Sequence, residues 1–447
     1  MTEASAALQS AWEDMLAGLE RAKAALESPE LFAPPVTDLG LAEGYRYLLG
    51  SAFGAIERSF MEDPRFPYFR RAIQPMDKAT IDNADALYLS AAIDGTQTYR
   101  VTGRVADHAH WSGGGRSDGP QAPSYVIFEN HSSYAGDSGE LTELGPGGRV
   151  VTAVLDTSTL EVGTDGTFEI LLAPERPAGH TGNFMATGKG EGEERVLAAY
   201  LIVRMLYGDW DNEVAPDLHI SYLGEGGARP AALSVEDAAA RMRRVGDLVA
   251  NQVAFWNVFY DQILETHGDR NGDGLSFMPR NAMNDPAGAN LATGGGQVTN
   301  YYSGGVFDLD EDQALLIEVS VPVEPAYAGF HLANFWGESL DYANHVSSLS
   351  HRQAETDADG VTRYVVCGTD LGVPNWLDCA GHPAGFLTMR WTYLSAPEQL
   401  PTVAVSLVPR DEVLKRLPAG TRTVSPRERA AQITKRQAHV QRRYRQY

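Results

Sequence analysis

The chain has 447 residues, of which 43% are hydrophobic and 21% are charged, and its formal net charge is −23. This length is sufficient for two or three domains, and the composition is that of a globular protein. The negative charge argues against a nucleic-acid binder, because most of the surface would repel phosphate. No apolar run of about 18 residues predicts a membrane span.

The N-terminal segment and the cysteines indicate a cellular compartment. Residues 1–30 lack the basic start and the apolar stretch of a secretory signal. Cys367 and Cys379 are too few for a disulfide framework, and their spacing matches no zinc pattern. We therefore expect a reduced, cytoplasmic protein without a metal or other cofactor.

Residues 1–78 are predicted to form an N-terminal helical region. Helical periodicity, with Ala, Leu and Met on one face, covers 5–27 and ends before a Pro-Pro pair. A second amphipathic segment covers 39–60. Together the two segments predict a helical hairpin.

The central part of the chain is predicted to contain two β-domains joined by a helix. Over 79–228, short β-type runs such as "SYVIFEN" and "TFEILLA" alternate with Gly, Asp, Pro and Ser, which is typical of a β-sandwich or barrel. Residues 229–298 contain a long helix from 234 to 268 and then a loop rich in Gly and Asp. A second β-domain is expected over 299–410.

The C-terminal segment, 411–447, is predicted to be a basic helical tail. It has ten Lys and Arg against three Asp and Glu, a local charge of +7 that leaves −30 in the rest of the chain. Ser425, Pro426 and Glu428 have the spacing of a helix start with a capping box. The tail is expected to dock on the acidic body or on a neighbouring subunit of a homo-oligomer, or to form a solvated helix.

The two β-domains resemble each other in sequence. "DGTFEILLAPERPAGHTGNFMATG" (165–188) parallels "DGVTRYVVCGTDLGVPNWLDCAG" (359–381), because each starts with Asp-Gly and reaches an Asn followed by an aromatic residue. Each copy then has a strand of the form L-x-x-R-x-x-Y, at 201–207 and at 387–393. An ordered series of matches predicts an internal duplication.

The arginine of that strand is a candidate ligand-binding residue. The period of two along a strand places Arg390 on the face opposite Leu387, Met389 and Trp391, and Arg204 is its counterpart. A buried arginine needs a partner, either a protein carboxylate or the carboxylate, sulfate or phosphate of a ligand. Recurrence in both copies favours a structural role, and Arg390 remains a candidate for substrate binding.

The stretch "GVPNWLDCAGHPAGFLTMRW" (372–391) holds the candidate catalytic residues. Asp378, Cys379 and His382 have no counterpart in the first copy. A histidine with a nearby carboxylate acts as a general acid or base, so Asp378 and His382 are expected to form a catalytic pair. No nucleophile motif such as G-x-S-x-G accompanies them.

Other residues are expected to contact a ligand. Asn375 and Trp376 follow a turn, His331 lies on a strand with aromatic neighbours, and Trp336 and Tyr302 are aromatic residues expected at the edge of a sheet. For Asn375 and Trp376 the alternative is a purely structural role in the loop and core.

The stretch "DRNGDGLSFMPR" (269–280) is a weak calcium-loop candidate. Asp269, Asn271 and Asp273 occupy ligand positions 1, 3 and 5, but position 12 is Arg280 instead of a glutamate. An Asp/Gly turn is the preferred interpretation.

Four stretches carry a resemblance to a known family. "DNADALYLSAAID" (82–94), "LYGDW" (206–210), "SLSHRQAETDADG" (348–360) and "GVPNWLDCAGHPAGFLTMRW" (372–391) resemble bacterial proteins labelled domain of unknown function twelve-fourteen, which often have a twelve-fifty-four-like N-terminal part. The resemblance covers about 80–410. It implies a pair of β-sandwich-like domains and an association with lipid, steroid or terpenoid metabolism, and it brings no catalytic residues.

The expected fold is therefore mainly β with helical additions: two related β-sandwich-like domains, an N-terminal helical hairpin, a linking helix and a C-terminal helix. The expected function is that of an enzyme acting on a hydrophobic small molecule by acid–base chemistry, as a hydratase, lyase or isomerase does. The alternative is a non-catalytic protein that binds a lipid or glycan on a sandwich surface.

Overall fold

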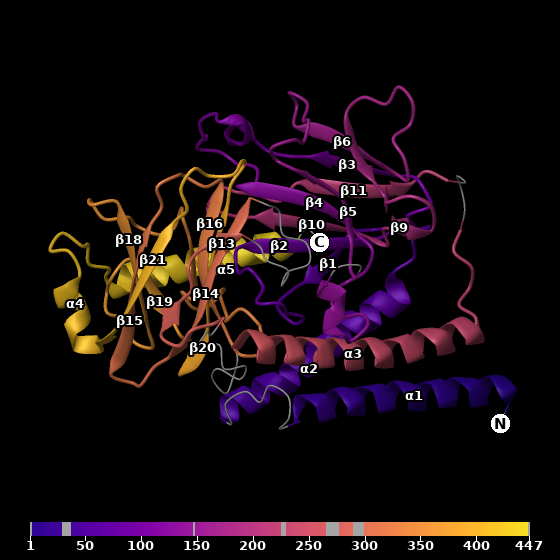
Figure 1. Ribbon diagram of the computed structural model, residues 1–447, viewed down its shortest axis with the longest axis horizontal. Helices are drawn as coiled ribbons and strands as arrows, with labels where there is room; N and C mark the ends of the chain where they lie inside the picture. Colours follow the sequence, from indigo (N-terminus) through magenta and orange to yellow (C-terminus); the bar gives the residue numbers. More distant parts are fainter. Residues whose placement is uncertain are drawn as a thin grey trace.

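The structure, a computed structural model, describes residues 2–28, 37–145, 148–224, 229–264, 277–288 and 299–445. Two β regions lie next to each other, and three helices run along one side of them (Figure 1). The expected fold class is confirmed, with a helical N-terminal part, a long middle helix and a C-terminal helix.

The helices begin where the sequence supplies capping residues. Helix α1 (Glu3–Leu26) and helix α2 (Asp38–Met61) start after threonines, Thr2 and Thr37, whose hydroxyls accept hydrogen bonds from backbone N–H groups. Helix α3 (Val235–Leu264) starts after Ser234, whose Oγ accepts from the N–H of Asp237 at 3.0 Å. Helix α1 packs along α3 so closely that a Cβ atom on Gly18 would lie 2.4 Å from the backbone of α3.

The first β region consists of two sheets. The larger sheet has the order β1-β2-β10-β4-β5 and the smaller one the order β11-β3-β6-β7. The strands are β1 (Arg70–Ile73), β2 (Ala86–Ala92), β3 (Tyr99–Arg104), β4 (Tyr125–His131), β5 (Val151–Asp156), β6 (Thr167–Ala173), β7 (Asn183–Ala186), β10 (Tyr200–Leu206) and β11 (Asp217–Tyr222). All neighbours are antiparallel except β6 and β7, which are parallel.

The second β region repeats this topology. Its larger sheet has the order β12-β14-β20-β16-β17, with β13 also beside β14, and its smaller sheet has the order β19-β18-β15-β21. The strands are β12 (Ala282–Met283), β13 (Ala287–Gly288), β14 (Asn300–Asp308), β15 (Gln313–Ser320), β16 (Tyr327–Ala333), β17 (Ser348–Ser350), β18 (Val361–Cys367), β19 (Trp376–Asp378), β20 (Ala384–Thr392) and β21 (Thr402–Pro409). The parallel pair, β18 and β19, stands where β6 and β7 stand in the first region, which is what an internal duplication predicts.

Short elements connect these sheets. They are the strands β8 (Gly188–Lys189) and β9 (Val196–Leu197), the 3-10 helices η1 (Ala109–Ser112), η2 (Leu141–Leu144), η3 (Gly192–Glu194) and η5 (Arg410–Glu412), and helix α4 (Val413–Arg416).

The repeated asparagines have the same role in both regions. The amide of Asn183 donates to the carbonyls of Glu161 and Glu169 and accepts from the N–H of Glu161. The amide of Asn375 does the same with Glu355 and Arg363. Asn375 therefore serves the framework, because its side-chain amide is already used by loop backbone.

Each pair of sheets encloses its own core through strand alternation. In β20, Leu387, Met389 and Trp391 point into the core of the second region, as the period of two predicts. In β10, Leu201 and Val203 do the same in the first region. The opposite faces of the two larger sheets are thus left for contacts outside the sandwich cores.

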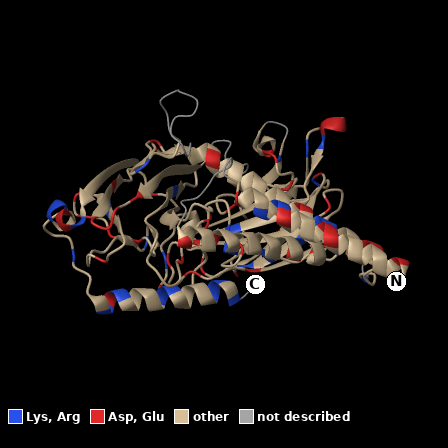
Figure 2. Cartoon of the chain, turned by 90° about the horizontal axis from the view of Figure 1, so that it is seen from below, with Lys and Arg blue, Asp and Glu red and all other residues tan. Residues whose placement is uncertain are grey.

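The C-terminal tail is helix α5 (Pro426–Arg445), and it docks on its own chain. Ser425 and Glu428 form the expected capping box, with Glu428 accepting from the N–H of Ser425 at 2.8 Å. Figure 2 shows its Lys and Arg residues along a helix that follows both β regions. Three arginines seven residues apart, Arg429, Arg436 and Arg443, are nevertheless buried. Of the three alternatives for the tail, docking on the body of its own chain is the one that the structure shows.

The stretches that carry the family resemblance converge on α5. Arg443 donates to the carbonyls of Ala84 and Ala86, and Arg442 donates to that of Trp210. In the second region, Arg436 donates to the carbonyl of Ser348 and Arg429 donates to the carbonyl of Val373. The four stretches thus form the joint between the two β regions and the helix that spans it.

Candidate functional site

A cavity of about 360 Å³ lies between the two β regions, and we call it the interdomain cavity. Strands β1, β2, β4 and β10 of the first region and β13, β14 and β20 of the second contribute to its wall, as do α2, α3 and the chain around β12. The volume is within the range of small-molecule sites, and it has room for about a dozen water-sized groups.

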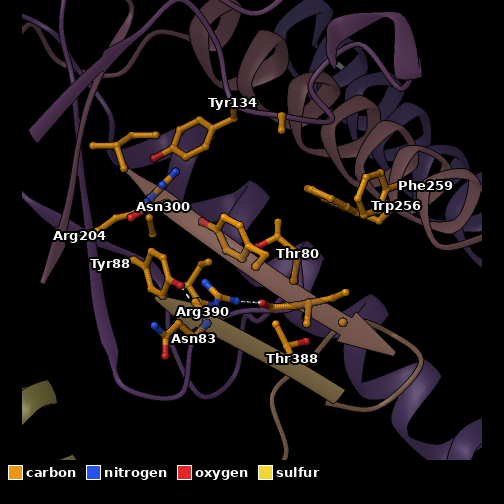
Figure 3. Close-up of a pocket in the computed structure, with 18 of the residues that line it drawn as sticks. Thr80, Asn83, Tyr88, Tyr134, Arg204, Trp256, Phe259, Asn300, Thr388 and Arg390 are labelled. Carbon is orange, nitrogen blue, oxygen red and sulfur yellow. Dashed lines mark hydrogen bonds between the residues drawn. The ribbon is translucent and has the colours of Figure 1, made fainter. Parts of the chain in front are cut away.

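One side of the interdomain cavity is apolar and aromatic. Trp256, Phe259 and Ile263 share a face of α3 at spacings of three and four residues, and all three line the cavity. In Figure 3, Trp256 and Phe259 lie on the side away from Arg204 and Arg390. The cavity is therefore suited to a molecule with an apolar body.

The two β regions contribute an equivalent pair of arginine and tyrosine to the cavity. Arg204 is paired across the sheet with Tyr88, and Arg390 is paired in the same way with Tyr302. All four line the interdomain cavity. The duplication thus brings equivalent Tyr–Arg pairs from two strands 186 positions apart to one site.

The two arginines differ in their partners. Arg204 forms an ion pair with Glu129 at 3.2 Å, and this carboxylate holds the pKa of Arg204 above its usual value although burial lowers it. Glu129 lies two residues after Ile127, the cross-strand partner of Arg204. In the second region the equivalent position, two residues after the cross-strand partner of Arg390, is His331. Burial and the charge of Arg390 hold the pKa of His331 well below its usual value, so this imidazole is uncharged.

Arg390 consequently has no acidic partner in the described part of the chain. One guanidinium N–H donates to the carbonyl of Ile81, and the guanidinium lies 5.7 Å from the ring of Tyr302. Arg390 Nε, Thr388 Oγ1 and Asn300 Oδ1 are buried and make no hydrogen bond with a described residue. All three residues line the cavity. Arg390 Nε and Thr388 Oγ1 can donate to an oxygen-rich or anionic group, whereas Asn300 Oδ1 can only accept and would need a donor such as a ligand hydroxyl.

Asp77 adds a carboxylate to the cavity wall. A Cβ atom on Gly54 of α2 would lie 2.1 Å from Asp77 Oδ2, so the carboxylate rests where only a glycine leaves space. Asp77 lines the cavity. Burial raises the pKa of Asp77 to about 7, against the charges of Arg70 and Arg58. This carboxyl can therefore take up and release a proton near neutral pH.

The expected pair of Asp378 and His382 is not formed, and this prediction needs correction. Asp378 Oδ2 lies 2.8 Å from His345 Nδ1, whereas His382 Nε2 lies 2.9 Å from a carboxylate oxygen of Glu43 on α2. The turn over 379–382 directs the two side chains to different partners. Neither residue lines the interdomain cavity, and His382 instead anchors α2 to the second β region.

The contact between His382 and Glu43 favours a protonated imidazole and an ionised carboxylate. Burial lowers the pKa of His382, but the hydrogen bond and charge of Glu43 raise it above its usual value overall. Burial likewise raises the pKa of Glu43, and the contact with His382 lowers it overall. Both shifts favour the charged forms, which is the behaviour of a structural ion pair.

The tryptophans expected to contact a ligand on a sandwich surface are buried instead. Trp376 donates to the carbonyl of Cys367 at 2.9 Å and lies beneath the guanidinium of Arg429. Trp336 is 1% exposed and donates to the carbonyl of Gly40 at 2.9 Å. These two residues therefore do not form an exposed surface for a lipid or glycan. The third aromatic residue expected on that surface, Tyr302, lines the interdomain cavity.

The remaining expectations concern ions and membranes. Asp269, Asn271 and Asp273 lie outside the described residues. Among the residues that are described, no three His, Cys, Asp or Glu side chains gather as a metal site requires. No helix in the described ranges is long and apolar enough to cross a lipid bilayer.

The sequence indicated some of the lining residues and missed others. Arg390, Tyr302 and His331 were expected to contact a ligand, and the first two line the cavity while the third replaces the acidic partner of Arg390. Asp77 and Trp256 were not expected. Trp256 lies in a helix whose periodicity indicates only a buried face, and Asp77 has no motif around it.

Comparisons with known proteins place the fold. No family model matches the chain, and no curated protein matches it, so the family resemblance seen in the four stretches is not assigned. A solved structure of an uncharacterised protein from Burkholderia cenocepacia is similar over 92% of this chain and 100% of its own, with a TM-score of 0.73 and 26% identity. A protein from Vibrio parahaemolyticus covers 87% of this chain and 100% of its own, with a TM-score of 0.39 and 12% identity. The chain is thus similar in structure to an uncharacterised bacterial protein.

Proposed function

We propose that this chain binds a small molecule with an apolar body and an anionic group in the interdomain cavity. The carrying observation is the difference between the equivalent arginines, since Arg204 has Glu129 and Arg390 has no acidic partner among the described residues. A ligand carboxylate would supply the missing partner of Arg390. The aromatic wall agrees with the lipid, steroid or terpenoid class that the family resemblance implies.

The physical argument rests on the cost of an unpaired buried charge. A guanidinium in a low-dielectric site is strongly disfavoured unless hydrogen bonds or an opposite charge offset its lost hydration. Thr388 and Asn300 add polar atoms without partners beside it. In Figure 3, Asn300 lies beside Arg204, Arg390 and Thr388 lie at the other end of the paired strands, and Trp256 lies apart from all of them. Such a separation of polar and apolar walls would fix the orientation of an amphipathic ligand.

Calorimetric binding of dodecanoate and of dodecan-1-ol tests this proposal. The wild type should bind the acid more tightly than the alcohol, because only the acid pairs with Arg390. Arg390→Gln should lose roughly 10- to 100-fold in affinity for the acid, as expected for a charge-assisted hydrogen bond, and keep its affinity for the alcohol.

Controls separate this effect from misfolding. Arg410→Gln changes a half-buried charge that does not line the cavity, and Trp12→Ala changes a tryptophan that is 53% exposed. Both should bind like the wild type, whereas Trp256→Ala should weaken the binding of both ligands. Equal affinity of the wild type for acid and alcohol, or no saturable binding, would argue against the proposal.

Acid–base chemistry on the bound molecule is the second candidate function, favoured by Asp77. In an isomerisation, the ionised carboxylate would accept a proton from a substrate carbon, and the resulting acid would return it to another carbon, so no atom is gained or lost. A carboxyl with a pKa of about 7 suits both steps at neutral pH. Asp77 replaces His382 and Asp378 as the candidate acid or base.

Deuterium uptake from D₂O into trans-3-dodecenoate, with formation of its conjugated isomer, tests the second candidate by NMR. The wild type should incorporate deuterium, and Asp77→Asn should not, while it still binds dodecanoate. An unchanged substrate with wild-type protein would leave the binding proposal standing and would rule out this isomerisation.

A further inference from the structure

Helix α2 has an apolar face that is largely exposed among the described residues, although the Tyr45 hydroxyl on this face donates to a carboxylate oxygen of Glu27 at the end of α1. Leu41, Tyr45, Leu49 and Phe53 follow one another every four residues and are 42–60% exposed. We call these four residues the α2 ridge. Residues four apart form one continuous row on a helix surface, which is the kind of row that packs into the groove of another helix.

The charged side chains of α2 point the other way and are already paired. Glu43 contacts His382, Arg46 contacts Glu338, and Arg58 forms two hydrogen bonds with Asp137, each at 2.8 Å. Helix α2 is therefore apolar on two faces, because Tyr47, Leu48 and Ala52 are buried in the core while the ridge is exposed. A helix face that stays in water is ordinarily polar, so an exposed apolar row on α2 indicates a partner surface.

The apolar area is large enough for a stable protein interface. Leu39, Ile56 and Met61 extend the ridge and are 38–60% exposed. With roughly 200 Å² for each large side chain, the seven residues expose about 700 Å². This exceeds the largest apolar patch on most monomers, and it approaches the roughly 800 Å² that each partner buries in a standard interface.

We infer that α2 is the contact surface of a homodimer, in which the α2 ridge of one copy packs against the α2 ridge of a second copy about a twofold axis. A twofold interface requires a surface that complements itself, and a single row of apolar residues meets its own groove in this way. The exposed part of α2 carries Asp38 at its start and Arg46, whose side chain is 39% exposed and is paired with Glu338, so two acidic chains can meet there with few charges at the contact. An anionic lipid surface would instead be repelled by the net charge of −23.

Sedimentation velocity at micromolar concentration tests the inference. The wild type should have twice the chain mass of 48.5 kDa. The double variant Leu49→Glu, Phe53→Glu should have the mass of one chain and an unchanged melting temperature, because both side chains are largely exposed. The matched control Leu407→Glu, Leu414→Glu, with side chains 46% and 59% exposed on β21 and α4, should remain a dimer.

A cross-linking measurement locates the contact. Cys367 and Cys379 are buried, so the variant Leu49→Cys has one exposed thiol. Under mild oxidation it should form a disulfide-linked dimer, and Leu414→Cys should not. A monomeric wild type, a double variant that keeps the dimer mass, or a monomer that floats with phosphatidylcholine vesicles would overturn the inference.

Discussion

Removal of one buried arginine tests whether α5 holds the two β regions together. Arg436 is 1% exposed and makes three hydrogen bonds, to the carbonyls of Tyr342 and Ser348 and to Ser348 Oγ, at 2.7, 2.9 and 2.6 Å. Its guanidinium also lies 4.5 Å from the ring of Trp210. The side chain therefore contacts both β regions from one helix.

The expected loss of stability follows from these contacts. Hydrogen bonds from a charged donor contribute about 1.5–3 kcal/mol each, and the truncated variant leaves their buried acceptors without a donor. Burial lowers the pKa of Arg436 to about 10, with the nearby charge of Arg443 acting in the same direction and the charge of Asp85 acting against both. The cost of removing the guanidinium from water therefore offsets part of the stabilisation from these hydrogen bonds. We expect Arg436→Ala to lower the free energy of unfolding by about 3–5 kcal/mol.

Urea unfolding and trypsin sensitivity of the tail measure this effect. Arg436→Ala should unfold at a lower urea concentration and should be cleaved faster between 411 and 445. The control Arg427→Ala removes an exposed arginine of the same helix and should change stability by no more than about 0.5 kcal/mol. A loss below about 1 kcal/mol for Arg436→Ala would refute the role assigned to α5.

Three further predictions concern other residues. His382→Ala should lower the free energy of unfolding more at pH 5.5 than at pH 8.5. Glu43 raises the pKa of His382 in the folded state, so the stabilisation is present below the unfolded pKa and is lost as pH rises through the folded pKa. Urea titrations at both pH values measure this difference. Asn183→Ala and Asn375→Ala should each cost about 1–3 kcal/mol by thermal or urea unfolding, since both leave equivalent backbone groups without partners, and a cost in one copy alone would contradict the equivalence. The affinity of the wild type for dodecanoate should fall as pH rises through about 7, where Asp77 ionises, and calorimetry on Asp77→Asn should show no such dependence.

Much of the fold could be predicted because it is encoded locally. Strand alternation placed Leu387 and Met389 in the core and Arg390 on the other face, and the capping box at Ser425 and Glu428 located the start of α5. The repeated Asn and Arg positions indicated two β regions with one topology. Each of these features depends on residues a few positions apart.

The site could not be predicted in the same way because its residues meet only through tertiary structure. Asp378 and His382 are close in sequence, yet their partners are His345 and Glu43 from distant segments. Arg204 and Arg390 differ because one position holds Glu129 in the first copy and His331 in the second. The sequence does not reveal the strand register that places these residues beside the arginines. The buried arginines of α5 were similarly invisible, since a basic tail is ordinarily a solvated one.

The most direct test of the proposed function is the difference in affinity between dodecanoate and dodecan-1-ol, measured by calorimetry on the wild type and on Arg390→Gln. The account predicts a clear preference of the wild type for the acid, and loss of that preference in the variant with binding of the alcohol retained. The same preference in both proteins, or none in either, would contradict the assignment of Arg390 as the partner of an anionic group.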